Sequence, residues 1–221
     1  LRTFSALFSI CFLTDSFAFG SSSEISKSLS ASIAIFCSTL KTFFSSLTTF
    51  FSSGSSPNNI DRGTSGLIIC PINLQAFSQL KTSFEKRKIK KSYKAIIQGS
   101  LKSQSGEINL PLIHSPRNRK KREVNKNGRE AITKYTTISS NDSYSLLDLD
   151  LITGRNHQIR AHLEYLKTPI VNDVLYGASR SHLLDRDTIC LQSYELEFEL
   201  FNKNYKFSIN EPEYFSSIMK M

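Results

Sequence analysis

The chain has 221 residues and a mass of 25.0 kDa, which is enough to bury one good core or two small ones. It carries 28 Lys and Arg against 19 acids, a formal net charge of +9 and a pI near 9.4, which favours a polyanionic partner, chiefly nucleic acid. The four scattered cysteines form no CxxC pair, which argues against a zinc site or a disulfide framework.

The basic excess is local. Residues 86–134 hold 15 Lys and Arg against 3 acids, whereas residues 1–59 hold 3 against 2. A short charge cluster is commonly a solvated surface. The density of this one favours contact with phosphate.

Residues 1–59 differ from the rest of the chain, because they contain 17 serines, 10 of the 16 phenylalanines and almost no charge. The apolar opening resembles a secretory or organelle-targeting segment, although no cleavage site is clear. Serines and charges interrupt every candidate membrane span. Another alternative is translation from the wrong frame or strand, because Phe and Ser codons complement those for Lys, Glu and Arg. We expect a segment that is poorly ordered or loosely helical.

A folded domain is predicted over residues 60–221. The small polar loop IDRGTSG precedes the strand LIIC and a turn at Pro71. Asn73 then caps a helix whose stripe of Phe77, Leu80 and Phe84 recurs at helical spacing. The basic residues 86–88 are expected in its last turn, where they complement the helix dipole.

Strand-like segments dominate the remainder. Alternating or β-branched runs predict strands in KKSYKAIIQG, GEINLPLI, AITKYTTIS, YSLLDLDLI, CLQSYELEF and KFSIN. Many strands with few helices indicate an α+β fold on a mainly antiparallel mixed sheet with a few flanking helices. Cys70 and Cys190 lie in apolar runs and are expected to be small buried hydrophobes in a reducing cytosol, which favours a cytoplasmic location. An organelle is the alternative if residues 1–59 are a genuine transit segment.

Residues 151–177, LITGRNHQIRAHLEYLKTPIVNDVLYG, gather two arginines and two histidines around one amphipathic segment. Thr153 is expected to cap a helix whose apolar positions are Ile159, Leu163 and Leu166. Arg155 then falls in the first turn and Arg160 further along, on a different face. This grouping suits the binding of anions.

No metal or nucleotide cofactor is predicted. His157 and His162 are five residues apart, whereas paired histidines on metal-binding helices are separated by about four. Neither GxGxxG nor GxxxxGK[ST] occurs. An Asp before a loop of small residues, as Asp61 is, most often forms a turn or caps a helix, and a lone carboxylate does not define a reaction.

The combination of blocks changes this interpretation. IDRGTSG, Tyr93 in KKSYKAIIQG, TGRNHQIRAHLEYLKTPI and DVLYG follow in the order and spacing of the RluA-like family of RNA pseudouridine synthases, which the chain resembles from about Ile60 to Pro212. The resemblance implies the pseudouridine synthase catalytic fold, N-terminally incomplete. It also implies that Asp61 is the nucleophile, that Tyr93 stacks on the target base and helps remove its C5 proton, and that Arg160 pairs with Asp61.

The same resemblance implies isomerisation of uridine to pseudouridine in ribosomal or transfer RNA, without a cofactor. The chain is expected to act as a monomer. RNA contacts are assigned to the basic surface of residues 86–134, including Lys90 and Lys91, and to residues near Asp61 and Arg160, namely Arg62, Thr64, Arg155, His157 and Gln158. His157 and Gln158 are alternatively structural.

Two departures from the family open a second interpretation. Before the catalytic Asp the family has H-R-L, where the arginine fills the space of the flipped base, but this chain has Asn58, Asn59 and Ile60. The family's preceding strand is also missing, so the catalytic sheet is expected to lack an edge partner. The alternatives are therefore a catalytically impaired RNA-binding remnant of the same fold, or a basic structural protein of the ribosome. Asn172 stands where the family usually has Gly, and Asn tolerates a left-handed backbone.

Overall fold

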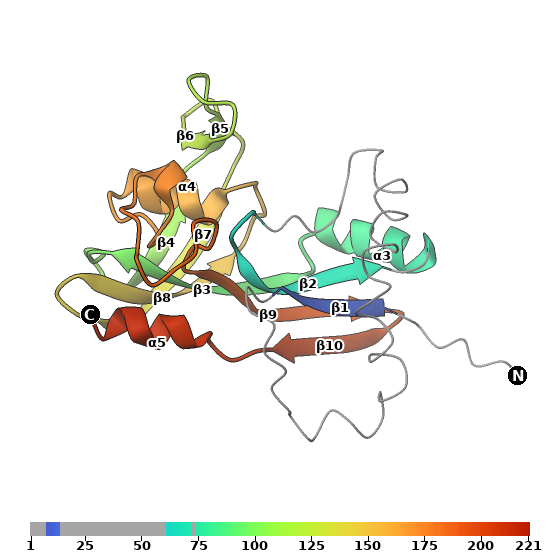
Figure 1. The fold of residues 1–221 in the computed structure, drawn as a ribbon. Coiled ribbons are helices and arrows are strands. Elements are labelled where there is room, and N and C mark those ends of the chain that lie inside the picture. Colours follow the sequence, from blue (N-terminus) through green and yellow to red (C-terminus); the bar gives the residue numbers. More distant parts are fainter. Residues whose placement is uncertain (1–7, 14–60, 72–73) are drawn as a thin grey trace, which may run out of the picture. The chain divides into compact units, whose positions relative to one another are not determined.

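The structure is a computed structural model, and it describes residues 8–13, 61–71 and 74–221 (Figure 1). Their strands form an eight-stranded sheet with the order β1-β2-β9-β3-β8-β7-β4, in which β10 also pairs with β9. These strands are β1 (Phe8–Leu13), β2 (Ser65–Pro71), β3 (Lys90–Gln98), β4 (Ser105–Asn109), β7 (Ile132–Ser140), β8 (Tyr144–Leu151), β9 (Leu191–Leu200) and β10 (Lys203–Ser208). Among the described strands only β2 and β9 run parallel. The predicted α+β fold on a mainly antiparallel mixed sheet is confirmed.

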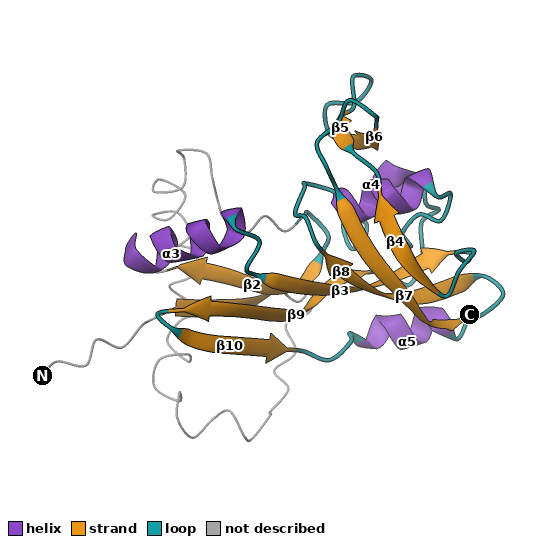
Figure 2. Ribbon diagram, turned by 180° about the vertical axis from the view of Figure 1, so that it is seen from behind, coloured by secondary structure: helices purple, strands orange, loops and turns teal. Residues whose placement is uncertain are grey.

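The other elements are few and short. A separate hairpin projects away from the sheet (Figure 2), and the helices flank the sheet. These elements are β5 (Leu112–His114), β6 (Arg122–Val124), α3 (Leu74–Glu85), α4 (Gln158–Tyr165), the 3₁₀ turn η1 (Val174–Tyr176) and α5 (Glu213–Met219). Of the helices described, none is long and apolar enough to cross a bilayer.

Strand β1 comes from the segment that was expected to be poorly ordered or loosely helical. Its residues pair antiparallel with β2, from Phe8 opposite Pro71 to Leu13 opposite Gly66. The expectation that the sheet lacks an edge partner before the catalytic loop is therefore wrong, because a strand from the start of the chain occupies that edge. The rest of residues 1–59, including Asn58 and Asn59, lies outside the described residues.

Helix α3 packs one stripe against the sheet, as its periodicity predicts. Leu80 is fully buried, and Phe84 packs at the edge of the same cluster. The helix ends at Glu85, because Arg87 has a left-handed φ of 55°. The basic residues 86–88 therefore follow the helix and are not in its last turn, which corrects the prediction. The predicted cap, Asn73, is outside the described residues.

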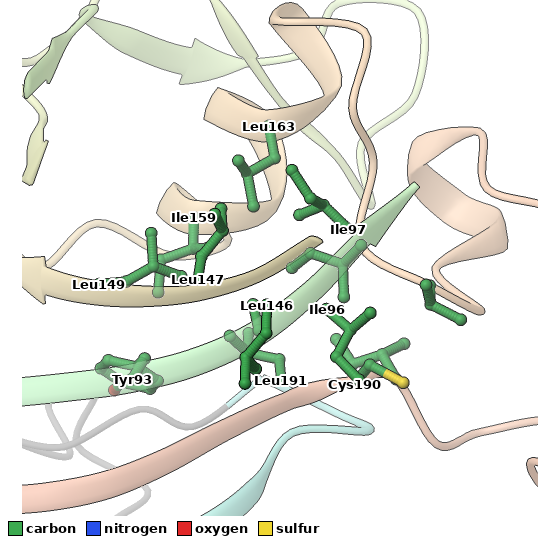
Figure 3. Close-up of a cluster of buried hydrophobic side chains, with 14 of the residues drawn as sticks. Tyr93, Ile96, Ile97, Leu146, Leu147, Leu149, Ile159, Leu163, Cys190 and Leu191 are labelled. Atoms are coloured by element: carbon green, nitrogen blue, oxygen red, sulfur yellow. The ribbon is translucent and has the colours of Figure 1, made fainter. Parts of the chain in front are cut away.

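The larger core lies around β3 and β8, which helices cover on both faces (Figures 1 and 2). Figure 3 shows Ile159 and Leu163 of α4 beside Leu147 and Leu149 of β8. Phe215 and Ile218 of α5 belong to the same buried cluster. Burial on both faces explains the consecutive apolar residues in these strands, since each side chain meets a helix whichever way it points.

Helix α4 begins later than its sequence predicts. The residue before it is His157, with a left-handed φ of 56°, and the first helical residue is Gln158. Thr153 does not cap the helix. Its hydroxyl accepts a hydrogen bond from the Ile132 N–H at 2.8 Å and donates one to Gln158 Oε1 at 2.8 Å. Arg155 therefore precedes the helix.

Two other expectations about apolar residues have different outcomes. Leu166, expected in the buried stripe of α4, follows the helix and is exposed. Cys190 is fully buried in the core, as expected, and burial raises the pKa of its thiol. The side chain of Cys70 is outside the described part of the structure.

Candidate active site

Asp61 lies in a tight loop before β2. Its backbone carbonyl accepts the Thr64 N–H at 3.0 Å, and the Gly63 carbonyl accepts the Ile189 N–H at 3.0 Å. Gly63 has a φ of +85°, and a Cβ there would lie 2.1 Å from the Asp187 carbonyl oxygen. Only glycine allows this approach. The loop is thus fixed against residues 187–189, and the Asp61 side chain is left 16% exposed.

Arg160 faces this carboxylate from α4. Its Nη1 lies 3.7 Å from Asp61 Oδ2, and the guanidinium side chain is only 7% exposed. Its strongest partner, however, is Asp173, which accepts from Nε at 2.7 Å and from Nη2 at 2.8 Å. Such a bidentate pair fixes the plane of the guanidinium. Burial acts to lower the pKa of Arg160, but the bonds and charge of Asp173 outweigh it and the pKa is raised. Arg160 is therefore charged and held in orientation before any ligand binds.

His157 lies near the other carboxylate oxygen of Asp61. Its Nε2 lies 3.8 Å from Asp61 Oδ1, and its Nδ1 is 2.9 Å from the hydroxyl of Tyr176. The Tyr176 oxygen already accepts the Arg122 N–H at 2.9 Å, so its own proton is available to His157 Nδ1. Burial lowers the pKa of His157, although the charge of Asp61 opposes this. A neutral imidazole with its proton on Nε2, facing Asp61, fits these contacts.

Tyr176 joins three parts of the site. Its ring is buried, with the Arg160 guanidinium and the Lys121 ammonium each 4.8 Å from the ring centre. Burial raises the pKa of its phenol, so the hydroxyl remains a hydrogen-bonding group. Through Arg122 it connects the β5–β6 hairpin to the residues around Asp61.

Tyr93 is buried on β3 opposite Ser193 of β9 (Figure 3). Burial raises the pKa of its phenol to about 12, and the negative charge of Asp61 acts in the same direction. Tyr93 and Asp61 are therefore within electrostatic reach of each other. The structure brings Asp61, Arg160 and His157 together, and the charge of Asp61 also acts on the Tyr93 phenol.

The residues that follow Asp61 have other partners. Arg62 pairs with Asp187 at 2.7 Å, and both side chains are exposed. The Thr64 hydroxyl is buried and, among the described residues, has no hydrogen-bond partner. The Ser65 hydroxyl is within hydrogen-bond distance of the Leu191 carbonyl, at 3.4 Å, and of the Tyr214 hydroxyl, at 3.3 Å. The hydroxyls of this loop therefore do not bond the Asp61 carboxylate.

Arg155 and Gln158 are bonded within the protein. Arg155 Nε donates to the Glu130 carbonyl at 2.9 Å. Gln158 is 2% exposed, and its amide bonds Thr153, Thr133 and the backbone of Arg155 and Ile132. These contacts favour the structural alternative for Gln158, since a buried amide with all its bonds made has none to offer to RNA.

The two lysines predicted to bind RNA differ from each other. Lys90 is exposed and lies 3.4 Å from Glu197. Burial lowers the pKa of Lys91, whose ammonium lies 5.3 Å from the centre of the Phe84 ring.

Unpaired positive charge is found instead in the β5–β6 hairpin, where Arg117, Arg119 and Lys120 are exposed and pair with no carboxylate of the described chain. Figure 2 shows this hairpin projecting from the sheet.

The second histidine of the motif belongs to the core. His162 is fully buried, with Nε2 at 3.0 Å from the Leu110 carbonyl and Nδ1 at 3.0 Å from the Thr133 hydroxyl. Burial lowers its pKa. In the described residues no group of His, Cys, Asp and Glu has the arrangement of a metal site.

Sequence reasoning did not assign Asp173 or Tyr176 to the site. Both belong to DVLYG, a block already recognised as part of the resemblance. The signal was therefore present, but the sequence does not say that Asp173 is the carboxylate that binds Arg160. That contact depends on how the turn after α4 returns to the helix.

A carboxylate between a fixed guanidinium and an imidazole, with a buried phenol nearby, defines a site for acid-base or nucleophilic chemistry on this sheet. Residues 53–165 match the family model of RNA pseudouridylate synthase, and the chain belongs to this family.

Individual relatives agree with this membership. The chain is 36% identical over 155 residues to ribosomal large subunit pseudouridine synthase D of Borreliella burgdorferi, covering 70% of this chain and 47% of that protein. It is 40% identical over 126 residues to an uncharacterized RNA pseudouridine synthase of Chloroflexus aurantiacus, covering 57% and 40%. The chain thus spans less than half the length of these two relatives.

Solved structures show the same fold. The human RNA pseudouridylate synthase domain containing 1 superposes with a TM-score of 0.63 at 20% identity, over 71% of this chain and 68% of that one. The human RNA pseudouridylate synthase domain containing 4 superposes with a TM-score of 0.60 at 22% identity, over 72% of each chain.

Proposed function

We propose that this protein isomerises uridine to pseudouridine in RNA, with Asp61 as the nucleophile. The observation that carries the proposal is the position of the Asp61 carboxylate, 3.7 Å from Arg160 and 3.8 Å from His157 in a chain of this family. A nucleophile needs a group that aims it, and here Asp173 holds that group in place.

The net reaction exchanges the bond from N1 to C1′ for one from C5 to C1′. Asp61 attacks the ribose anomeric carbon as the bond from N1 to C1′ breaks, the base turns, and C5 bonds to C1′ while the bond from Asp61 to C1′ breaks. If Asp61 instead adds to the uracil ring, its bond to the ring breaks again after C5 has bonded to C1′. The proton lost from C5 is matched by one gained at N1, so nothing is consumed and no cofactor is required. With a pKa of about 12, Tyr93 keeps its proton at neutral pH. It therefore offers the uracil its ring and its hydroxyl, and removal of the C5 proton is assigned to the Asp61 carboxylate once its bond to the RNA has broken.

RNA affinity is assigned mainly to the β5–β6 hairpin. Its exposed cations Arg117, Arg119 and Lys120 are free to neutralise phosphates, whereas Lys90 has a carboxylate nearby. Lys121, at the base of the hairpin, bonds Glu164 at 2.6 Å and contacts Tyr176. The hairpin therefore supports contact with the RNA backbone close to the site.

The target is proposed to be a uridine of ribosomal or transfer RNA. One relative is named a ribosomal large subunit pseudouridine synthase, which favours ribosomal RNA of the two. A cytoplasmic location is proposed as well, because the free buried thiol of Cys190 suits a reducing compartment.

Asp61→Asn tests the proposal. The variant, wild type and the control Asp142→Asn, an exposed acid in the β7–β8 turn, are incubated with unmodified ribosomal and transfer RNA transcripts. Nucleoside mass spectrometry should detect pseudouridine with wild type and the control, but not with Asp61→Asn. RNA affinity of Asp61→Asn should stay within about twofold of wild type, because phosphate contacts supply most of it.

The sequence Asn58-Asn59 favours a second candidate, an RNA-binding remnant without activity. Wild-type protein that binds these transcripts and forms no pseudouridine would establish that alternative and refute the first. Covalent capture of 5-fluorouracil-containing RNA by wild type, but not by Asp61→Asn, would contradict both the remnant and a purely structural ribosomal protein.

A further inference from the structure

Asn172 is a buried residue that the proposed reaction does not use. It has a left-handed φ of 67° and is 3% exposed. Its side chain makes three hydrogen bonds. Nδ2 donates to the Asp185 carbonyl at 2.9 Å and to the Thr188 carbonyl at 2.6 Å, and Oδ1 accepts the Ser181 N–H at 3.0 Å.

All three partners belong to one segment, residues 181–188, which the amide holds at three residues, Ser181, Asp185 and Thr188. The segment has no helix or strand to order it. Glycine would adopt the same left-handed backbone without strain, but it has no side chain for these bonds. Asparagine here therefore does more than tolerate the turn, since it ties a loop to the turn after α4.

The same segment fixes the loop that carries Asp61. Ile189, next to Thr188, donates its N–H to the Gly63 carbonyl, and the Asp187 carbonyl packs against the Gly63 α-carbon. Arg62 also pairs with Asp187. Asn172 is thus connected to the loop of the nucleophile by one intervening stretch of backbone.

Asp173, the residue next to Asn172, acts on Arg160, which faces Asp61. Asp173 binds Arg160 through two short hydrogen bonds, and Arg160 faces Asp61 at 3.7 Å. Two adjacent side chains therefore contact the two halves of the Asp61–Arg160 pair. Asp173 bonds Arg160 directly, and Asn172 is connected to the Asp61 loop through residues 181–188.

We propose that Asn172 is a positioning residue that holds the Asp61 loop in register with Arg160. The proposal rests on the proposed function for its effect on turnover, but its structural part does not. Because a misplacement of about 1 Å costs roughly 100-fold in rate, loosening this loop should lower kcat far more than RNA affinity.

The test is Asn172→Gly, which keeps the left-handed backbone and removes the three side-chain bonds. The matched control is Asn202→Gly, an exposed asparagine with a left-handed φ of 59° in the β9–β10 turn. At a temperature where circular dichroism shows both variants folded, Asn172→Gly should reduce kcat on the RNA transcripts by roughly 10- to 100-fold, with KM and RNA affinity within about twofold. The control should match wild type.

Hydrogen exchange of the free protein gives a readout independent of activity. In Asn172→Gly the amides of Thr64 and Ile189 should exchange faster, while those of the β3–β8 pair remain protected. Unchanged exchange at Thr64 and Ile189 overturns the proposal, even if wild type proves inactive. Faster exchange with unchanged kcat, or an equal loss of kcat and RNA affinity, overturns the positioning role in catalysis.

Discussion

Replacing Asp173 should cost the protein a large part of its stability, because it leaves Arg160 charged and buried without the carboxylate that accepts its two short hydrogen bonds. The two side chains are 1% and 7% exposed, so water cannot replace the lost acceptor oxygens. Two charge-assisted hydrogen bonds of about 1.5–3 kcal/mol each are removed. Breaking a buried pair on one side is expected to cost about 3–5 kcal/mol, and the two figures agree. We therefore expect Asp173→Ala to lower the free energy of unfolding by about 3–5 kcal/mol.

The assay is urea unfolding of wild type, Asp173→Ala, Arg160→Met and the double variant at pH 7. Since replacing both partners by apolar groups is often nearly neutral, the double variant should be more stable than Asp173→Ala. Asp173→Asn, which keeps the shape and one acceptor, should cost less than Ala. Pseudouridine formation should fall in both Asp173→Ala and Arg160→Met. A loss below about 1 kcal/mol in Asp173→Ala, with additive effects in the double variant, would refute the reasoning.

Two further predictions concern RNA affinity and pH. Replacing Arg117, Arg119 and Lys120 by Gln should weaken binding to all RNAs alike and reduce the salt slope by about 0.7 per lost phosphate contact, measured by filter binding between low and moderate salt; an unchanged slope would exclude the hairpin. His162 is neutral when folded because burial lowers its pKa, so the unfolded chain takes up its proton first and stability falls as pH drops below about 6.5. Urea unfolding at pH 7.5 and 5.5 should show this fall, and His162→Gln should reduce it; an equal fall in the variant would assign it to other groups.

The sequence was most informative where a local pattern decides the structure. Alternation and β-branched residues located β3, β7, β8, β9 and β10, and the stripe around Leu80 located α3. These patterns reflect which side of a strand or helix meets the core, and that depends on neighbours in the chain. The left-handed backbone at Asn172 was also consistent with its residue type.

Helix ends and hydrogen-bond partners were less predictable. Thr153 has the chemistry of a helix cap, but its hydroxyl meets Ile132 and Gln158, because β7 and α4 pass close to it. Basic residues after Phe84 looked suited to a last turn, yet Arg87 ends the helix by its left-handed backbone. Tertiary contacts override local preference in both cases.

By itself the sequence determined the α+β class, most strands, and, through the resemblance, the pair Asp61 and Arg160. Only the tertiary structure decided that Asp173 binds Arg160 with two hydrogen bonds, that Tyr176 links the hairpin to His157, and that β1 occupies the sheet edge. The physical reason is that residue type specifies what a side chain can bond. The choice among several carboxylates or hydroxyls is made by distance, and distances between remote segments are set by packing of the whole sheet and its helices.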